Sequence, residues 1–567
     1  MNLLDEVRLA DEACDAAVAA IASPEELFAK QAEWRAAWLG AMGGLPEERT
    51  PLNARVTGVV ECDGFRMENV VFESLPGVFV TAHLALPLAR TPGHASLPKP
   101  PYPLVLMPLG HSDNGILNPR YAAHFAMAAR AGFAVLSWDP LSQGERRQSS
   151  DPRFDANCAV EHSRLGSRCW LVGWNFARFH IWDAMRAIDY AESRPDLDSS
   201  RLGIMGTSGG GTMSAFLQAL DPRVKVAFPN CYVSSLREVV RERGCHDSEQ
   251  FFWNMLPAGL NHASLLALGQ PRVALAIGSR WHDYFPHVGA ESTFAVLSNL
   301  AARLGLPGPF WHFSCDGPHG LPPSTRAAQT DWMRHCILGA EAPRPPEAYR
   351  ALDAGGTDEN DPAGRSPHPF PAEAAFCTPT HQVRDLPGFR SLYAVVADEA
   401  RRLAAARARA PRTRDELRAI VRRRAGIRPL AELPAEVQAP FDHPNFNWWY
   451  LTGPYGARRE NEAAILSTLG RSAVGRDAEN ILIRAAAESR ARSGAPVPLH
   501  ANGWDCIAAA HAYAAEPQLF SSVAFTDPPP SWTDLVADPT PGRESYATAV
   551  WGALRDYDWP DLVGEAP

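Results

Sequence analysis

Residues 201–228 read RLGIMGTSGGGTMSAFLQALDPRVKVAF, and this stretch decides the predicted fold of the first half of the chain. A short apolar run leads into GTSGG (206–210), and an apolar segment of helical character follows. A G-x-S-x-G motif between a strand and a helix places its serine on a sharp, strained turn, where small neighbours leave the hydroxyl exposed. Ser208 is therefore the candidate nucleophile. The alternative is a glycine-rich helix N-terminus that only packs tightly or binds an anion.

Short apolar runs and helical segments alternate between residues 55 and 340. Helical segments such as 121–131 and 175–193 separate the apolar runs, which stand at 103–109, 133–138, 202–205, 224–228, 273–277 and 310–313. Continuous apolar strands that alternate with helices indicate a parallel sheet covered on both faces. The predicted fold class is therefore α/β, with a mostly parallel, doubly wound sheet.

A serine hydroxyl is a weak nucleophile, so the motif requires an acid and a histidine that follow it in the order Ser, Asp or Glu, His. Asp283 comes after the strand predicted at 273–277, and His319 lies in a Gly/Pro loop after the last predicted strand. Both therefore stand at carboxyl ends of strands, where open α/β sheets build their sites. His282 and His287 are rival bases, and Asp316 is a rival acid.

Acyl transfer also needs donors for the oxyanion of the transition state. The backbone N–H of Gly209 is the first candidate, and the N–H of His111, after the strand at 103–109, is the second. The His111 side chain could equally be that of a loop histidine without a role. The candidate substrate-binding residues are Ser112, Trp138, His162, Tyr232 and Trp281.

No motif for a metal or a nucleotide is present: H-E-x-x-H, paired cysteines, G-x-x-x-x-G-K-[ST] and G-x-G-x-x-G are all absent. We therefore expect no cofactor and no metal. Residues 229–270 are open to two interpretations, a lid over the site or surface packing.

Composition excludes several classes of protein. The chain has 567 residues, 46% of them hydrophobic, and a formal charge of -10 without a basic arm, so we expect no nucleic-acid partner. The ten cysteines form no C-x-x-C pair, and the first residues resemble no signal peptide. These features predict a cytoplasmic protein without a membrane partner. From the candidate triad we expect a small-molecule ester as substrate, and the chain could form a homo-oligomer.

The sequence divides into four predicted parts. Residues 1–50 are a helical extension, 51–340 the catalytic domain, 341–372 a Pro/Gly-rich linker and 373–567 a second unit. The second unit ends with VPLHANGWDCIAAAHAYAAEPQLFSSVAF (497–525), which has the same strand, turn, helix and strand order as 201–228. The second half is therefore a candidate diverged copy of the first.

The first half resembles bacterial α/β-hydrolases of the acetyl xylan esterase-like group, which are related more distantly to cephalosporin C deacetylases and prolyl oligopeptidases. The stretches that carry the resemblance are TPLNARVTG (50–58), PLGHSDNG (108–115), SWDPLSQGER (137–146), NFARFHIWDAMRAIDYAESRPDLDSSRLGIMGTSGGGT (175–212) and GPHG (317–320). The resemblance implies an α/β-hydrolase fold with Ser208, Asp283 and His319 as its triad and His111 at the oxyanion hole.

The longer relatives in this group carry a second, incomplete hydrolase-like domain, and RSAVGRDAENIL (471–482) and ALRDYDWPDL (553–562) resemble it. In this chain Gly503, or Asp505 in a shifted alignment, stands where that domain would carry its nucleophile. Gly209 replaces the Gln that follows the nucleophile in the better-known deacetylases, so their substrates do not carry over.

We therefore predict a serine carboxylic-ester hydrolase that acts through an acyl-enzyme. The alternatives are a peptidase or amidase of prolyl-oligopeptidase type, an acyltransferase or other biosynthetic enzyme, and a binding or scaffold protein that has kept only the fold.

Overall fold

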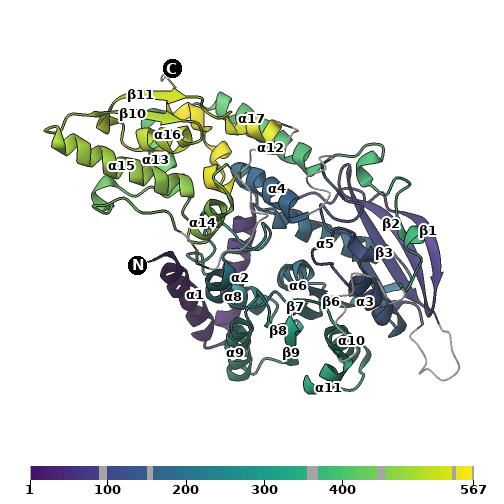
Figure 1. The fold of residues 1–567 in the computed structure, drawn as a ribbon. Coiled ribbons are helices and arrows are strands. Elements are labelled where there is room, and N and C mark those ends of the chain that lie inside the picture. The colour runs from purple at the N-terminus through teal and green to yellow at the C-terminus, as the bar shows by residue number, and fades with distance from the viewer. Residues whose placement is uncertain are drawn as a thin grey trace.

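The structure is a computed structural model of the whole chain. It describes residues 2–88, 99–149, 158–353, 368–441, 443–444, 454–538 and 545–564. Two units are visible in Figure 1: a large one built on a twisted sheet, and a smaller C-terminal one packed at one end of it.

A nine-stranded sheet in the order β1-β2-β3-β5-β4-β6-β7-β8-β9 forms the centre of the large unit. Its first three strands are antiparallel, β1 (Arg55–Cys62), β2 (Phe65–Leu75) and β3 (Val78–Pro87). The others run parallel to one another: β4 (Tyr102–Leu106), β5 (Ala134–Trp138), β6 (Leu197–Thr207), β7 (Val226–Asn230), β8 (Ala274–His282) and β9 (Phe310–Pro318). The predicted α/β class is confirmed.

Helices cover both faces of this sheet, as the continuous apolar strands require. The buried side chains of α3 (Pro119–Arg130) and α10 (Pro323–Leu338) form one core with the sheet. On the opposite face a second core contains side chains of α5 (Ala177–Glu192), α6 (Gly209–Leu220), α8 (His262–Ala267) and α9 (His287–Leu304).

The N-terminal helices α1 (Leu3–Ala19) and α2 (Pro24–Met42) extend the second core. Trp38 of α2 is 1% exposed, and the rings of Phe216 and Phe252 meet it edge-on at 5.1 and 5.0 Å. These helices therefore pack on the large unit, as expected of the predicted helical extension.

The C-terminal unit is small and mostly helical. It has one parallel pair of strands, β10 (Val497–Asn502) and β11 (Phe520–Thr526), which the sequence predicted together with the helix between them, α16 (Asp505–Ala515). Its remaining helices are α12 (Leu392–Arg409), α13 (Arg414–Ala425), α14 (Ala457–Thr468), α15 (Ala473–Ala491) and α17 (Trp532–Ala537).

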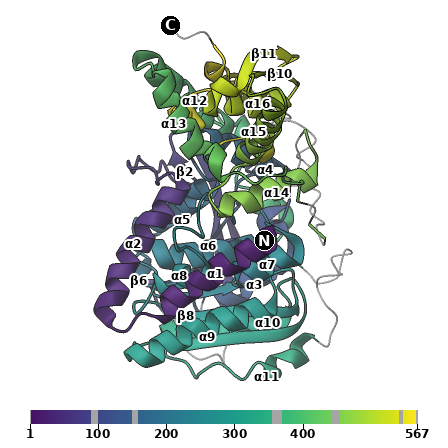
Figure 2. The same cartoon turned by 90° about the vertical axis from the view of Figure 1, so that its left-hand side faces the viewer.

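This unit shares a hydrophobic core with α4 (Cys158–Val172) of the large unit, and Figure 2 shows the two units stacked. Trp170 of α4 is enclosed by four aromatic rings, whose centroids lie 4.7 to 6.2 Å away. Two of those rings, Tyr546 and Trp551, come from the end of the chain. The two units are therefore packed as one body.

The predicted linker 341–372 contains residues 354–367, which lie outside the described residues. Just after them the chain packs along the antiparallel edge of the large sheet. Asn69 on β2 donates a hydrogen bond to the carbonyl of Ala374, and the Glu145 carboxylate accepts from the N–H groups of Cys377 and Thr378. The start of the predicted second unit at 373 thus belongs spatially to the first.

The turn between β10 and α16 repeats the geometry of the turn at Ser208. Gly503 has a φ of 59°, close to the 62° of Ser208. Its N–H donates to the carbonyl of Thr526 on the neighbouring strand at 3.0 Å, as the N–H of Ser208 donates to Asn230 at 3.0 Å. Gly503, and not Asp505, therefore stands at the position that corresponds to the nucleophile.

No helix in the described part of the chain is long and apolar enough to cross a membrane. All ten cysteines are free thiols.

Candidate active site

Ser208 lies on a strained turn between β6 and α6. Its φ of 62° and ψ of −125° are uncommon for a residue with a side chain, and such strain is typical of functional turns. The turn also needs glycine nearby, since a Cβ on Gly210 would lie 2.1 Å from the carbonyl oxygen of Pro108 at the end of the β4 region. The sequence therefore places Ser208 as the motif predicts, beside the loop that carries His111.

Asp283 and His319 meet at the carboxyl ends of β8 and β9. The His319 Nδ1 donates to the Asp283 Oδ1 at 2.9 Å, and the Phe285 N–H donates to the same oxygen at 2.9 Å. Burial would raise the pKa of Asp283, but the His319 ring and these hydrogen bonds hold it below its usual value. The carboxylate therefore stays charged and orients the imidazole, the arrangement that a serine hydrolase requires.

Tyr284 connects this pair to Ser208. Its ring stacks on His319, with centroids 4.1 Å apart, and its hydroxyl hydrogen-bonds with Ser208. Burial and the Asp283 carboxylate raise the pKa of Tyr284 well above its ordinary value, so the phenol keeps its proton. Ser208 itself is only 8% exposed, less than the motif predicts, because the site is covered. We did not predict Tyr284; its place next to Asp283 was the only signal.

The rival residues make other contacts. His282 is exposed and pairs with Asp316 at 3.3 Å. His287 lies near Ser279 and pairs with Glu291 at 3.2 Å. The Asp283–His319 pair differs from these contacts because Tyr284, which stacks on His319, also hydrogen-bonds with Ser208.

The loop after β4 approaches the nucleophile closely. A Cβ on Gly110 would lie 3.0 Å from the Ser208 Cβ, and the Tyr121 hydroxyl hydrogen-bonds with the Gly110 backbone. Within the described part of the chain, the N–H groups of His111 and Gly209 donate no hydrogen bond. Both groups are therefore free to bind an oxyanion, as predicted for them.

A small pocket adjoins this loop. Its wall includes Gly110, His111, Trp138, Gly209 and Glu249. Trp138, a predicted substrate contact, thus lines the pocket beside the candidate oxyanion donors. Ser112 is buried next to it, where its N–H donates to the Gln143 side chain and its hydroxyl donates to Asn114.

Three further predicted substrate contacts lie elsewhere. Tyr232 is 2% exposed and packs in the core against Phe285. His162 is fully buried as well, so neither side chain is exposed to a substrate in the pocket. Trp281 is 42% exposed, but its ring lies under Arg350, and its Nε1 donates to Ser314 at 2.7 Å. Tyr232 and Trp281 thus lie away from Trp138, whereas His162 lies behind the pocket wall, 3.3 Å from the His111 ring.

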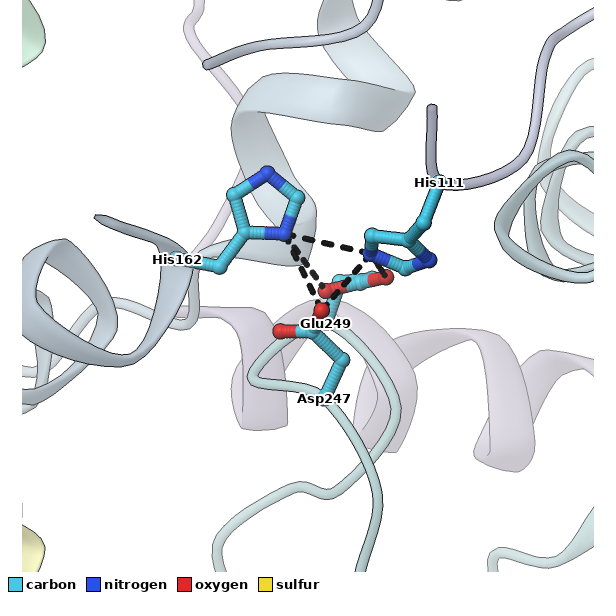
Figure 3. Close-up of side chains that lie close together, drawn as sticks. All are labelled: His111, His162, Asp247 and Glu249. Carbon is cyan, nitrogen blue, oxygen red and sulfur yellow. Dashed lines mark hydrogen bonds and ion pairs between the residues drawn. The ribbon is translucent and has the colours of Figure 1, made fainter. Parts of the chain in front are cut away.

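Among the described residues, two clusters contain side chains of the types that ligate metals: Cys231, Asp283 and His319, and next to them His111, His162, Asp247 and Glu249. The first is part of the candidate triad. The second is shown in Figure 3. Burial would lower the pKa of His162, but Asp247 and Glu249 raise it to about 9. Burial and Asp247 raise the pKa of Glu249 to about 7.

Asp247 and Glu249 belong to segment 229–270, for which a lid and surface packing were the two alternatives. The segment is buried between the two units. The N–H groups of Asn254 and Leu256 donate to the carbonyls of Ser467 and Thr468 in the C-terminal unit. The finding favours packing, although Glu249 also lines the pocket.

Comparisons with known proteins give partial matches, and no family model matches the chain. It is 27% identical over 177 residues to "Putative hydrolase YtaP" of Bacillus subtilis, with 31% of this chain and 55% of that protein covered. It is 30% identical over 132 residues to "Acetyl esterase Axe7A" of Xylanibacter ruminicola, with 23% and 29% covered. The chain thus spans about half, or less than a third, of the curated relatives that it matches.

Among solved structures, Methylesterase BT1017 matches 60% of this chain and 73% of its own, with 18% identity and a TM-score of 0.45. An acetyl xylan esterase from Paenibacillus sp. R4 matches 54% and 94%, with 16% identity and a TM-score of 0.35. The chain is therefore similar, over part of its length, to proteins named as hydrolases and esterases.

Proposed function

We propose that this chain is a serine hydrolase that cleaves carboxylic esters with a small acyl group. One observation carries the proposal: a strained serine with two free N–H donors beside it lies at the carboxyl edge of a parallel sheet, and Tyr284 connects it to an aspartate–histidine pair at the same edge. The similarity to proteins named as acetyl esterase and hydrolase supports the same class of reaction.

In the proposed reaction His319 takes the proton of the Ser208 hydroxyl as its oxygen attacks the ester carbonyl. The carbonyl oxygen becomes an oxyanion, which the N–H groups of Gly209 and His111 bind. His319 then gives the proton to the departing alcohol, which leaves Ser208 acylated. In the second half His319 takes a proton from water as the water oxygen attacks the acyl carbonyl, and it returns the proton to the Ser208 oxygen as the acid leaves. General base and oxyanion donors each contribute about 10²–10³-fold to such a reaction.

The enclosure of the site supports a small acyl group. Ser208 is 8% exposed, and Trp138, His180 and Met213 line the same small pocket as Gly209. A long acyl chain would have to displace these buried side chains. Acetyl esters are therefore the proposed substrates.

A series of p-nitrophenyl esters from acetate to octanoate tests both parts. We expect the highest kcat/KM for acetate and a fall as the chain lengthens, and we expect Ser208→Ala to keep less than a few per cent of the activity. Activity that survives in Ser208→Ala would refute the serine mechanism. A preference for octanoate would refute the small acyl pocket only, and cleavage of amide analogues at comparable rates would favour the peptidase alternative.

A further inference from the structure

Two histidines and two carboxylates from three segments converge next to the candidate active site. His111 follows β4, His162 lies on α4, and Asp247 and Glu249 lie in the loop after α7 (Leu236–Arg243). Figure 3 shows the four side chains pointing toward one another. Their potential ligand atoms all lie within 4.8 Å of one another.

The separations between these atoms resemble the edges of a metal coordination tetrahedron. The Nε2 of His111 lies 3.3 Å from the Nδ1 of His162 and 3.4 Å from the Oε1 of Glu249. The Nδ1 of His162 lies 3.1 Å from the Oδ2 of Asp247 and 3.7 Å from the Oε2 of Glu249. Zinc bonds of about 2.0–2.2 Å place tetrahedral ligand atoms roughly 3.3–3.6 Å apart. Both contacts of Asp247 Oδ2 are shorter, 3.1 Å to His162 and 2.6 Å to His111, and the two Glu249 distances are measured to different oxygens of its carboxylate.

Outer hydrogen bonds orient the ligand atoms toward the centre of the cluster. The Nε2 of His162 donates to the carbonyl of Leu141 at 2.9 Å, so Nδ1 is the nitrogen that can offer its lone pair when a metal displaces its proton. The Oδ1 of Asp247 accepts from the Ser248 N–H at 2.6 Å, which leaves Oδ2 facing inward. Such outer contacts are typical of histidine and carboxylate ligands in metal sites.

Glu249 supplies a second, independent observation. Its side chain is 3% exposed and its carboxyl hydrogen-bonds with Asp247. Within the described chain its Oε2 still has no hydrogen-bond partner, and it faces the His162 Nδ1 at 3.7 Å. A buried carboxylate oxygen without a hydrogen bond is costly. A bound cation would satisfy it.

The chemistry of the donors selects the class of ion. Metal binding displaces protons from its ligands, and the two deprotonated imidazoles and two carboxylates then carry a charge of about −2, which a divalent cation balances. Imidazole nitrogen favours zinc and its neighbours among the first-row transition metals over Mg²⁺ or Ca²⁺, which prefer oxygen. Four protein ligands also complete a zinc site without an open position, which is the pattern of a structural site.

We propose that His111, His162, Asp247 and Glu249 bind one divalent transition-metal ion, with zinc as the expected ion, and that this ion has a structural role. It would fasten the loop after β4 to α4 and to segment 229–270. The proposal does not depend on the proposed function, because binding of the ion requires no turnover.

The test uses the full-length protein after dialysis against a chelator. Zn²⁺, Co²⁺ and Mg²⁺ are titrated separately, with calorimetry for affinity and stoichiometry and visible absorption for the geometry of bound Co²⁺. We expect one Zn²⁺ per chain, an intense visible cobalt spectrum of tetrahedral type, and no measurable Mg²⁺ binding. Metal content of the undialysed protein gives an independent check.

Asp247→Asn and Glu249→Gln are the test variants, because each removes one ligand charge at almost constant size. Each should weaken Zn²⁺ binding by at least about 100-fold. Loss of an outer partner of a ligand already costs about 10–100-fold in metal affinity, and loss of a ligand itself should cost no less. Glu161→Gln is the matched control, since Glu161 is also a buried carboxylate on α4 but accepts from the Gln148 N–H outside the cluster. It should bind Zn²⁺ like the parent protein. Circular dichroism establishes that each variant is folded.

The neighbouring cluster of Cys231, Asp283 and His319 requires its own control. Cobalt bound there would show a near-ultraviolet thiolate band that disappears in Cys231→Ser, whereas the proposed site has no sulfur ligand. The proposal is overturned if folded protein binds no Zn²⁺, if Glu249→Gln and Asp247→Asn bind it as tightly as the parent, or if Cys231→Ser abolishes binding. If Asp247→Asn does not fold, the Zn²⁺ affinity of folded Glu249→Gln decides between the two outcomes.

Discussion

Substitution of Gly210 tests whether activity requires close contact between the turn at Ser208 and the loop after β4. A Cβ at position 210 would lie 2.1 Å from the Pro108 carbonyl oxygen and 3.0 Å from the Pro108 carbonyl carbon. Both contacts are with backbone, so no side chain can rotate out of the way. Gly210→Ala therefore has to separate the serine turn from the loop that carries His111.

The size of the effect follows from that contact. The two segments must move apart by about 1 Å before the contact is tolerable, and a misplacement of about 1 Å typically costs about 10²-fold in rate. We therefore expect kcat/KM for p-nitrophenyl acetate to fall about 100-fold, equivalent to about 2.7 kcal/mol of transition-state stabilisation. Overpacking also costs about 1–3 kcal/mol of stability, so rates are measured well below the melting temperature.

Gly40→Ala is the matched control, because nothing lies within 4 Å of a Cβ built at Gly40 on α2. It should keep full activity and gain up to about 1 kcal/mol of helix stability. The reasoning is refuted if folded Gly210→Ala hydrolyses the ester within about threefold of the parent rate.

Two further predictions concern stability. Trp170→Ala should lower the free energy of unfolding by about 3–5 kcal/mol, because four rings from both units surround that side chain. Calorimetry should show one unfolding transition, and Phe28→Ala is the control because that side chain is exposed and its loss should change stability little. Two separate transitions in the parent protein would contradict the shared core. Burial raises the pKa of Glu460 from 4.5 to about 7, so its proton stabilises the fold below pH 4.5 and this contribution is lost as the pH rises to about 7. Between pH 5 and 8 the parent should therefore lose about 2–3 kcal/mol relative to Glu460→Gln in denaturant titrations, and parallel pH profiles would contradict the raised pKa.

The parallel half of the sheet could be predicted from sequence because each of its strands is a continuous apolar run next to a helix. The runs at 103–109, 133–138 and 273–277 correspond to β4, β5 and β8 within a few residues. The antiparallel strands β1 to β3 were not predicted. Their signal was present in the Asp63-Gly64 and Pro76-Gly77 pairs, which join them as tight hairpins.

The sequence predicts site residues by one rule, that catalytic side chains stand just after the carboxyl ends of strands. Ser208, Asp283 and His319 lie where this rule places them, and their catalytic roles stay a prediction. Tyr284 was missed because only the fold turns its ring onto His319.

The cluster of His111, His162, Asp247 and Glu249 shows the same limit more strongly. Its residues come from three segments with no common spacing, so no motif links them. The packing of the C-terminal unit on α4 could not be predicted from sequence either, since a hydrophobic residue such as Trp170 could belong to the core of either unit.

The central claim, that Ser208 is an activated nucleophile, is tested most directly with a fluorophosphonate that forms a covalent bond only with such a serine. Purified protein is labelled, and the adduct is located by peptide mass spectrometry in the parent and in His319→Ala. We predict a single adduct on Ser208 that disappears in His319→Ala. Folded protein that stays unlabelled, or an adduct on another serine, would contradict the account and favour a binding protein with this fold.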